Sequence, residues 1–173
     1  MKKKDILISL AIIFAAVIAF NFLLSRQGHI KIDTAGVEMY LHSGIFSQTK
    51  VTSGEGPLRL KARSYQAKRV TIEKKDNSDR WRIYATGPSW GKLKRIKVGA
   101  NETTSVELGP PLIVRPRVSP RRKYVSIGLE IIGKAGEHYS PRVAKNARAL
   151  PVPGLKIVDE QGKTLAVGKF AYG

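Results

Sequence analysis

Residues that could carry acid, base or metal chemistry are few and scattered in this sequence. The three histidines, His29, His42 and His138, lack the four-residue helical spacing that commonly binds a metal. There is no cysteine, so the sequence offers no disulfide and no thiolate ligand or nucleophile. The carboxylates form no recognisable acid–base pair, and nucleophile-elbow, phosphate-loop and dinucleotide motifs are absent. The sequence therefore predicts no metal or cofactor and favours a non-enzymatic protein, leaving open a catalytic site built from distant positions.

Cations are the functional groups that this chain has in excess. It carries 31 Lys and Arg against 13 Asp and Glu, a net charge of +18, and residues 58–123 alone hold 18 against 5. In three segments the cations alternate with apolar residues, and in a β-strand this period places them on one face of the sheet. The candidate anion-binding residues are Arg59, Lys61, Arg63, Arg80, Arg82, Arg115, Arg117, Arg121 and Arg122.

Two interpretations of these cations remain open. If their strands are neighbours, they form a positive surface for lipid headgroups, acidic envelope polymers or an acidic protein, because guanidinium groups bind phosphate and carboxylate well. Alternatively, they keep an exposed sheet soluble and protect its edges. Nucleic acid is disfavoured, since the zinc-finger, RNA-recognition and helix-turn-helix patterns are all missing. Trp90 follows Pro88-Ser89 in a predicted turn, where it is either an exposed contact aromatic or a cap on the core.

The elements that must position these side chains are mostly strands. Apolar residues occupy alternate positions from Val125 to Ile131, which predicts a half-buried strand, and prolines in 114–118 indicate an edge strand or a polyproline segment. Residues 155–158 and 164–167 predict a hairpin whose loop ends in Gly162. Residues 133–153 read as a long loop with one helical turn near 143–149. The expected class is all-β, specifically an immunoglobulin-like or prealbumin-like β-sandwich.

An apolar segment precedes this domain. Residues 6–24 are interrupted only by Ser9 and Asn21, and as a helix they would span roughly 28 Å, close to the thickness of a bilayer core. Their length and bulky C-terminal end favour a single-pass anchor over a cleaved signal peptide, and Lys2 to Lys4 predict a cytoplasmic N-terminus. The predicted division is a cytoplasmic stub (1–5), a transmembrane anchor (6–24), a juxtamembrane linker (25–35) and an extracytoplasmic β-rich domain (36–173).

The C-terminal segment carries a resemblance. Residues 157–170 (Ile-Val-Asp-Glu-Gln-Gly-Lys-Thr-Leu-Ala-Val-Gly-Lys-Phe) resemble hairpins of exported β-sandwich modules of the prealbumin-like and immunoglobulin-like kind, which implies that fold class. Residues 168–173 are similar to the tail of uncharacterised exported bacterial proteins whose chain continues with Cys or selenocysteine. That similarity implies an in-frame UGA codon after Gly173, and a redox or metal function in residues that the sequence lacks.

These observations lead to one leading expectation and two alternatives. The leading expectation is a membrane-anchored extracytoplasmic binding module whose basic surface takes an anionic partner. The alternatives are a redox or metal-binding protein with its active tail missing, and a structural subunit of the cell envelope.

Overall fold

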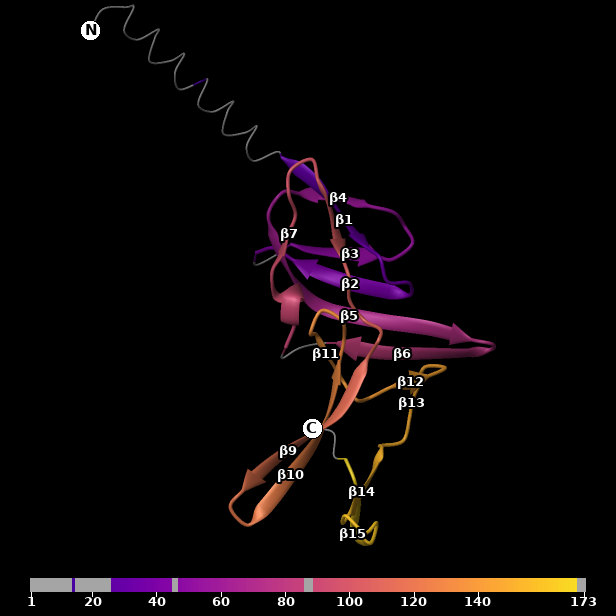
Figure 1. The fold of residues 1–173 in the computed structure, drawn as a ribbon. Coiled ribbons are helices and arrows are strands. Elements are labelled where there is room, and N and C mark those ends of the chain that lie inside the picture. The colour runs from indigo at the N-terminus through magenta and orange to yellow at the C-terminus, as the bar shows by residue number, and fades with distance from the viewer. Residues whose placement is uncertain (1–13, 15–25, 45–46, 86–88, 171–173) are drawn as a thin grey trace, which may run out of the picture.

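The predicted all-β class is confirmed by the computed structural model, which describes residues 14, 26–44, 47–85 and 89–170 (Figure 1). In this part of the chain the strands are β1 (Gln27–Ile32), β2 (Val37–His42), β3 (Gln48–Thr52), β4 (Leu58–Lys61), β5 (Ser64–Asp76), β6 (Asp79–Ala85), β7 (Ile96–Lys97), β8 (Thr103–Val106), β9 (Ile113–Arg121), β10 (Tyr124–Ile132), β11 (His138–Tyr139), β12 (Ala144–Lys145), β13 (Arg148–Ala149), β14 (Gly154–Val158) and β15 (Thr164–Lys169). A 3-10 turn, η1 (Gly91–Lys94), lies between β6 and β7.

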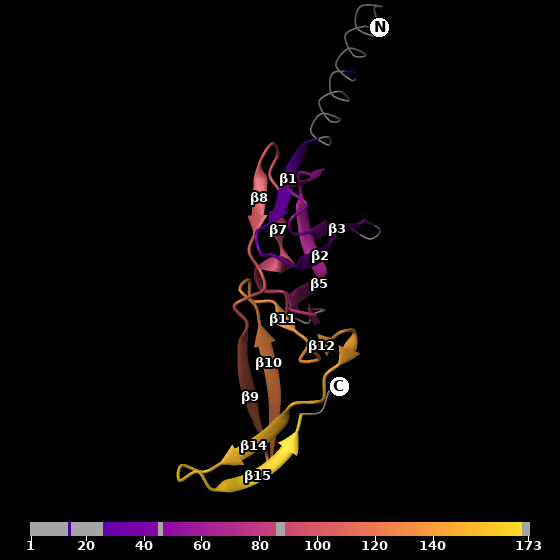
Figure 2. The same cartoon turned by 90° about the vertical axis from the view of Figure 1, so that its right-hand side faces the viewer.

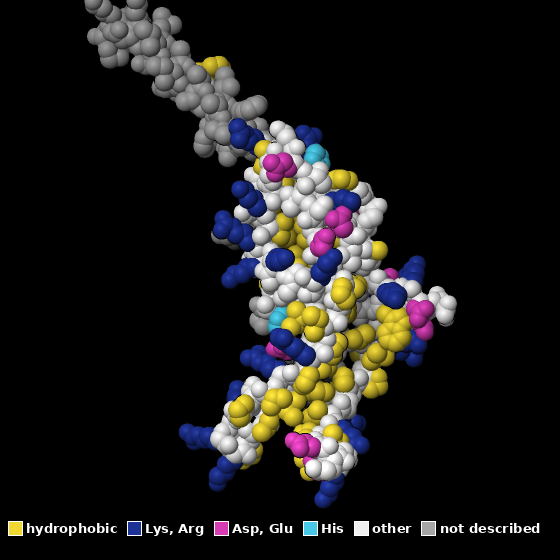
Figure 3. Space-filling view, viewed as in Figure 1, with side chains coloured by type: hydrophobic (Ala, Val, Ile, Leu, Met, Phe, Trp, Pro, Cys, Tyr) yellow, Lys and Arg dark blue, Asp and Glu magenta, His cyan; other side chains and the backbone are white. Residues whose placement is uncertain are grey.

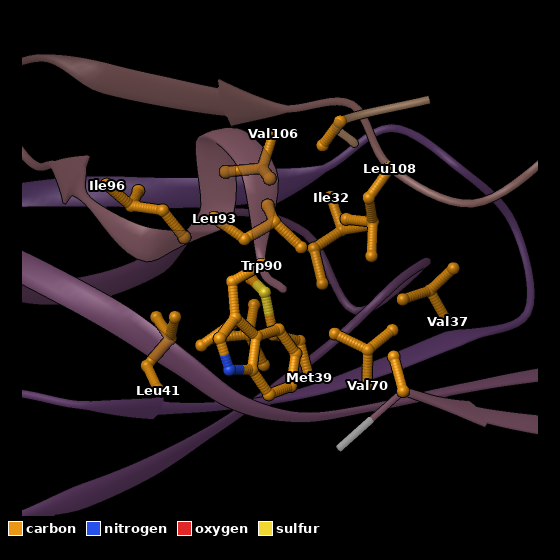
Figure 4. Close-up of a cluster of buried hydrophobic side chains, with 14 of the residues drawn as sticks. Ile32, Val37, Met39, Leu41, Val70, Trp90, Leu93, Ile96, Val106 and Leu108 are labelled. Atoms are coloured by element: carbon orange, nitrogen blue, oxygen red, sulfur yellow. The ribbon is translucent and has the colours of Figure 1, made fainter. Parts of the chain in front are cut away.

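Two sheets share one hydrophobic core and form the body of the molecule. One sheet has the order β4-β1-β8, with β1 and β8 parallel, and the other has the order β3-β2-β5-β6-β12-β13, with β7 paired to β5. Alternate residues of each central strand point inward, as the buried Ile30 and Ile32 of β1 and Met39 and Leu41 of β2 show. These side chains meet with Leu93 and its neighbours between the sheets (Figure 4). The arrangement is consistent with a β-sandwich.

Two hairpins project from the body, away from the start of β1 (Figures 1 and 2). The first, which we call the basic hairpin, comprises residues 113–132 and pairs β9 with β10 over nine residues, or roughly 30 Å at 3.3 Å per residue. Its base joins the body where β10 pairs with β11. The second, the C-terminal hairpin, comprises residues 154–169 and pairs β14 with β15.

Several predicted elements are confirmed. The strand expected at 125–131 is β10, but the predicted burial of its apolar face is wrong towards the tip, where Val125 is 62% exposed. The proline-containing segment before it is β9, an edge strand that pairs only with β10 in its sheet. The C-terminal hairpin has the predicted strands, and Gly162 adopts the left-handed conformation (φ 81°) that its loop needs.

The helical turn expected near 143–149 is wrong, because this segment forms the tight hairpin β12–β13. Its two loop residues, Asn146 (φ 50°) and Ala147 (φ 64°), are both left-handed, as the commonest two-residue hairpin loop requires. The Asn146 side chain donates to Asp79 Oδ1 (2.9 Å) and accepts from the Arg80 backbone N–H (2.8 Å). Contacts with a distant strand therefore fix a turn that the local sequence does not reveal.

The N-terminal predictions are tested only in part. The proposed anchor, residues 6–24, lies outside the described residues apart from Phe14, which is helical, as do residues 171–173 at the other end. Over the ranges that are described, no helix combines the length and the apolarity needed to cross a bilayer. The linker expected at 25–35 is corrected by β1, whose Ile30 is fully buried, so this strand is part of the folded domain.

Candidate anion-binding groove

The predicted cations of β4 lie on the outer face of the small sheet. Arg59 and Lys61 are exposed, and in the register they lie opposite His29 and Gln27 of β1. Arg63 follows the strand, with its guanidinium carbon 5.4 Å from the centre of the Tyr65 ring. No ion pair involves these three residues within the described ranges, and Arg59 and Lys61 belong to an edge strand bonded only to β1.

Arg80 and Arg82 of β6 lie on the outer face of the large sheet and share one carboxylate there. Both form ion pairs with Glu73 of β5. Arg80 Nε lies 3.1 Å from Glu73 Oε1, and Arg82 Nη2 lies 2.5 Å from Glu73 Oε2. The hydrogen bond from Arg82 lowers the pKa of the Glu73 carboxyl below its ordinary value of 4.5. Arg82 and Glu73 line a hollow of about 740 Å³ together with Arg69 and Glu38, so two cations face two carboxylates there.

The remaining predicted cations belong to the basic hairpin. Arg115 Nε lies 3.0 Å from Glu130 Oε2, Arg117 Nη1 lies 3.6 Å from Glu130 Oε1, and Arg121 and Arg122 are exposed at the turn. Strands β4, β6 and β9 are not neighbours in any of the sheets described. The nine candidates therefore form three separate groups. They do not form the single positive surface that was expected if their strands were neighbours.

A different set of cations gathers in a groove between η1, β7 and the edge of β8, which we call the basic groove. It has a volume of about 550 Å³ and is lined by Lys92, Leu93, Arg95, Ile96, Lys97, Thr104, Ser105, Val106, Glu107, Lys134 and Ala135. In Figure 3, Lys and Arg side chains stand along the side of the body on which Figure 1 places β7 and η1. Sequence reasoning missed this site, although four cations within residues 92–97 were a visible local signal.

The fold presents these cations through burial of the residues between them. Leu93 and Ile96 are buried in the core, so Lys92, Arg95 and Lys97 are left exposed beside them. On the far wall, Thr104 Oγ1 donates to the Lys97 carbonyl at 3.1 Å and joins β8 to β7.

Gly91 holds η1 close to the loop that forms the floor of the groove. Its φ of +49° is left-handed, and a Cβ at this position would lie 2.1 Å from the Ala135 carbonyl oxygen, so only glycine fits. The Lys92 backbone N–H donates to that same carbonyl at 2.8 Å. The short helical turn is therefore fixed directly against Ala135.

The charge of the groove is largely uncompensated. Four cations and one carboxylate line it, which leaves three net positive charges, whereas the charges of the larger hollow cancel. Lys134 pairs with Glu107 (Nζ to Oε2, 2.6 Å), while Lys92, Arg95 and Lys97 have no ion pair with any described residue. Ammonium and guanidinium donors beside the hydroxyls of Thr104 and Ser105 are suited to phosphate, sulfate or carboxylate oxygens.

Trp90, a candidate contact aromatic, is part of the core. Its exposed fraction is 8%, and its indole lies beside Met39 between the sheets (Figure 4). This placement matches the alternative interpretation of the sequence, in which the ring folds back to cap the core. Trp90 thereby anchors the N-terminal end of η1 and supports the groove from inside.

One buried carboxylate organises the loops behind the groove. Glu137 is fully buried; its Oε1 accepts from the Gly109 N–H (2.6 Å) and the Tyr139 hydroxyl (2.7 Å), and its Oε2 accepts from the Ala135 N–H (2.9 Å). Burial, together with this neighbouring carboxylate, raises the pKa of the Tyr139 hydroxyl, so it remains a donor. Since Ala135 lines the groove, Glu137 positions its floor.

Comparisons of the chain with protein-family models, with curated proteins and with solved structures find no match. The resemblance of the C-terminal segment to exported β-sandwich modules, and the immunoglobulin-like or prealbumin-like subdivision that it implies, therefore stay predictions.

Proposed function

We propose that this chain is a membrane-anchored extracytoplasmic module that binds an anionic partner in its basic groove. The observation that carries the proposal is the set of three exposed cations, Lys92, Arg95 and Lys97, that line one wall without a carboxylate partner in the described structure. Exposed like charges held together repel each other, and a bound anion relieves that repulsion. A positive groove also raises the local concentration of anions and speeds their association.

The partner that suits this site carries repeated acidic groups. The groove runs along β8, an edge strand of its sheet, and its cations come from η1, β7 and the loop after β10, so charges are spread along it. An acidic polymer or an acidic protein segment can contact several of them together, whereas one small anion contacts few. The large polar hollow beside Glu73 is a poorer site for an anion because its two carboxylates balance the charge of its two cations.

The location belongs to the same proposal and is supported by the sequence. Residues 6–24 have the length and composition of a single-pass anchor, and the lysines before them favour an extracytoplasmic location for the following domain. In that setting, acidic envelope polymers, acidic envelope proteins and anionic headgroups are the available partners.

The test is salt-dependent binding of the full-length chain to heparin, used as a polyanion probe. We expect the triple variant Lys92→Gln/Arg95→Gln/Lys97→Gln to bind more weakly and with a shallower dependence of log K on log salt, because fewer counterions are released. The matched control, Lys68→Gln/Lys74→Gln/Lys75→Gln, removes three exposed cations of β5 that lie outside the groove. Equal losses in the two variants would mean that only net charge matters and would overturn the proposal.

A further inference from the structure

The basic hairpin is amphipathic from its turn to Arg115, and only its basal pair, Ile113 with Ile132, is apolar on the cationic face as well. Its register places four cross-strand pairs on one face, and all eight side chains are apolar: Val125 with Pro120, Ile127 with Val118, Leu129 with Pro116, and Ile131 with Val114. The pairs between them fall on the other face, where Arg121 lies opposite Tyr124, Arg117 opposite Gly128 and Arg115 opposite Glu130. One face is therefore wholly apolar, and the other is mainly cationic or polar.

Most of the apolar face has no cover within the described structure. Ile131, at the base, is 7% exposed, but Val118 and Val125 towards the tip are 59% and 62% exposed. Figure 3 shows hydrophobic side chains along the projecting hairpins, with Lys and Arg at their ends. An isolated two-stranded hairpin is marginally stable in water, and a contiguous exposed apolar face typically marks a surface that binds something.

We propose that the basic hairpin lies in the interface of an anionic lipid bilayer, with its apolar face in the acyl region and its cations among the headgroups. Charge complementarity favours the anionic bilayer over a second copy of the chain and over an acidic polymer. Residues 113–132 carry five cations and one carboxylate, so a second copy of the hairpin would bring like charges together. An acidic polymer would satisfy the cations but leave the valines in water, whereas an anionic bilayer accommodates both faces.

The turn of the hairpin is suited to the membrane–water boundary. Tyr124, 79% exposed, lies beside a run of three cations, Arg121, Arg122 and Lys123. Tyrosine is enriched at this boundary because its ring is apolar and its hydroxyl is polar, and the long cationic side chains extend to the headgroups. The tip lies at the end of the molecule opposite the start of β1 (Figures 1 and 2), so a chain anchored through residues 6–24 presents it to a second bilayer.

The experiment measures capture of one membrane by another. The full-length chain is reconstituted in phosphatidylcholine nanodiscs, which are then floated with vesicles of phosphatidylcholine alone or with phosphatidylglycerol added. We expect capture by the phosphatidylglycerol vesicles only. Arg121→Gln/Arg122→Gln/Lys123→Gln should weaken capture by about 100-fold, from roughly fivefold per cation. Val118→Ser/Val125→Ser should weaken it by about tenfold through the lost apolar burial.

Two control variants separate this inference from general effects of charge and of exposed apolar area. Val158→Ser/Val167→Ser removes exposed valines of the C-terminal hairpin, and Lys68→Gln/Lys74→Gln/Lys75→Gln removes three exposed cations of β5; both should capture vesicles as the parent chain does. Unchanged urea midpoints for all variants show that each is folded, since the substituted side chains are exposed.

Three results would overturn the inference. They are capture of neutral vesicles to the same extent, loss of capture with the cation variant but not with the valine pair, and a dimer in light scattering that the valine pair dissociates. The second result would indicate purely electrostatic attraction, and the third would assign the apolar face to a second copy of the chain.

Discussion

Replacing Glu137 with alanine should destabilise the fold more than any surface substitution, because three donors lose their acceptor at once. Those donors are the Gly109 and Ala135 backbone N–H groups and the Tyr139 hydroxyl, at 2.6 to 2.9 Å from the carboxylate. Hydrogen bonds to a charged acceptor contribute about 1.5–3 kcal/mol each, and a buried donor left unpaired costs about 1–3 kcal/mol. Part of this loss is offset, since the variant no longer buries a charge. We therefore expect Glu137→Ala to lower the free energy of unfolding by about 3–5 kcal/mol.

Two companion variants make the test specific. Tyr139→Phe removes one donor and leaves the carboxylate its two backbone partners, so we expect a loss of about 1–2 kcal/mol. Glu137→Gln keeps one oxygen but turns an amide NH₂ towards a backbone N–H, and we expect an intermediate loss of about 2–3 kcal/mol. The assay is urea unfolding of the full-length variants, followed by circular dichroism in a single detergent. A Glu137→Ala chain within 1 kcal/mol of the parent, or one no worse than Tyr139→Phe, would refute the reasoning.

Three further predictions follow from the groove and its surroundings. Gly91→Ala should both lower the urea midpoint and weaken heparin binding, because a Cβ 2.1 Å from the Ala135 oxygen must displace η1; unchanged binding in a folded variant would contradict this. Trp90→Ala should cost about 3–5 kcal/mol of stability, the usual range for a buried tryptophan, whereas an exposed contact residue would cost little. The lowered pKa of Glu73 adds stability that is present above pH 4.5 and is lost as the pH falls through the lower folded-state pKa. Glu73→Gln should therefore reduce the loss of stability at acidic pH in a stability–pH profile. An unchanged loss would mean that other carboxylates cause it.

The fold was predictable in the two hairpins whose own sequences carry a clear alternation or turn signal. Alternating apolar residues revealed β10, and turn residues revealed β14 and β15, because both signals lie within one hairpin. Strand β1 was missed because its buried pair, Ile30 and Ile32, is short and its parallel partner β8 lies some 70 residues away. No pattern within a short stretch of sequence predicts such a pairing.

The candidate site, too, was predictable only where its residues lie close together in the sequence. The cations of residues 92–97 are a local cluster, and recognising a buried Leu93 between them would have predicted an exposed basic turn. Lys134 and Glu107 reach the groove only through tertiary contacts, so their part in it was not predictable. Conversely, Arg80 and Arg82 appeared available on the outer face of their strand, yet both pair with the single carboxylate of Glu73 on the neighbouring strand.

Lysine acetylation footprinting tests the central claim most directly, because it asks which cations a bound polyanion covers. The full-length chain is acetylated with and without heparin, and the modification of each lysine is read by mass spectrometry. The account predicts protection of Lys92, Lys97 and Lys134 in the basic groove, with Lys68 and Lys75 modified as before. Uniform protection of all exposed lysines, or protection that leaves the groove lysines fully reactive, would contradict it.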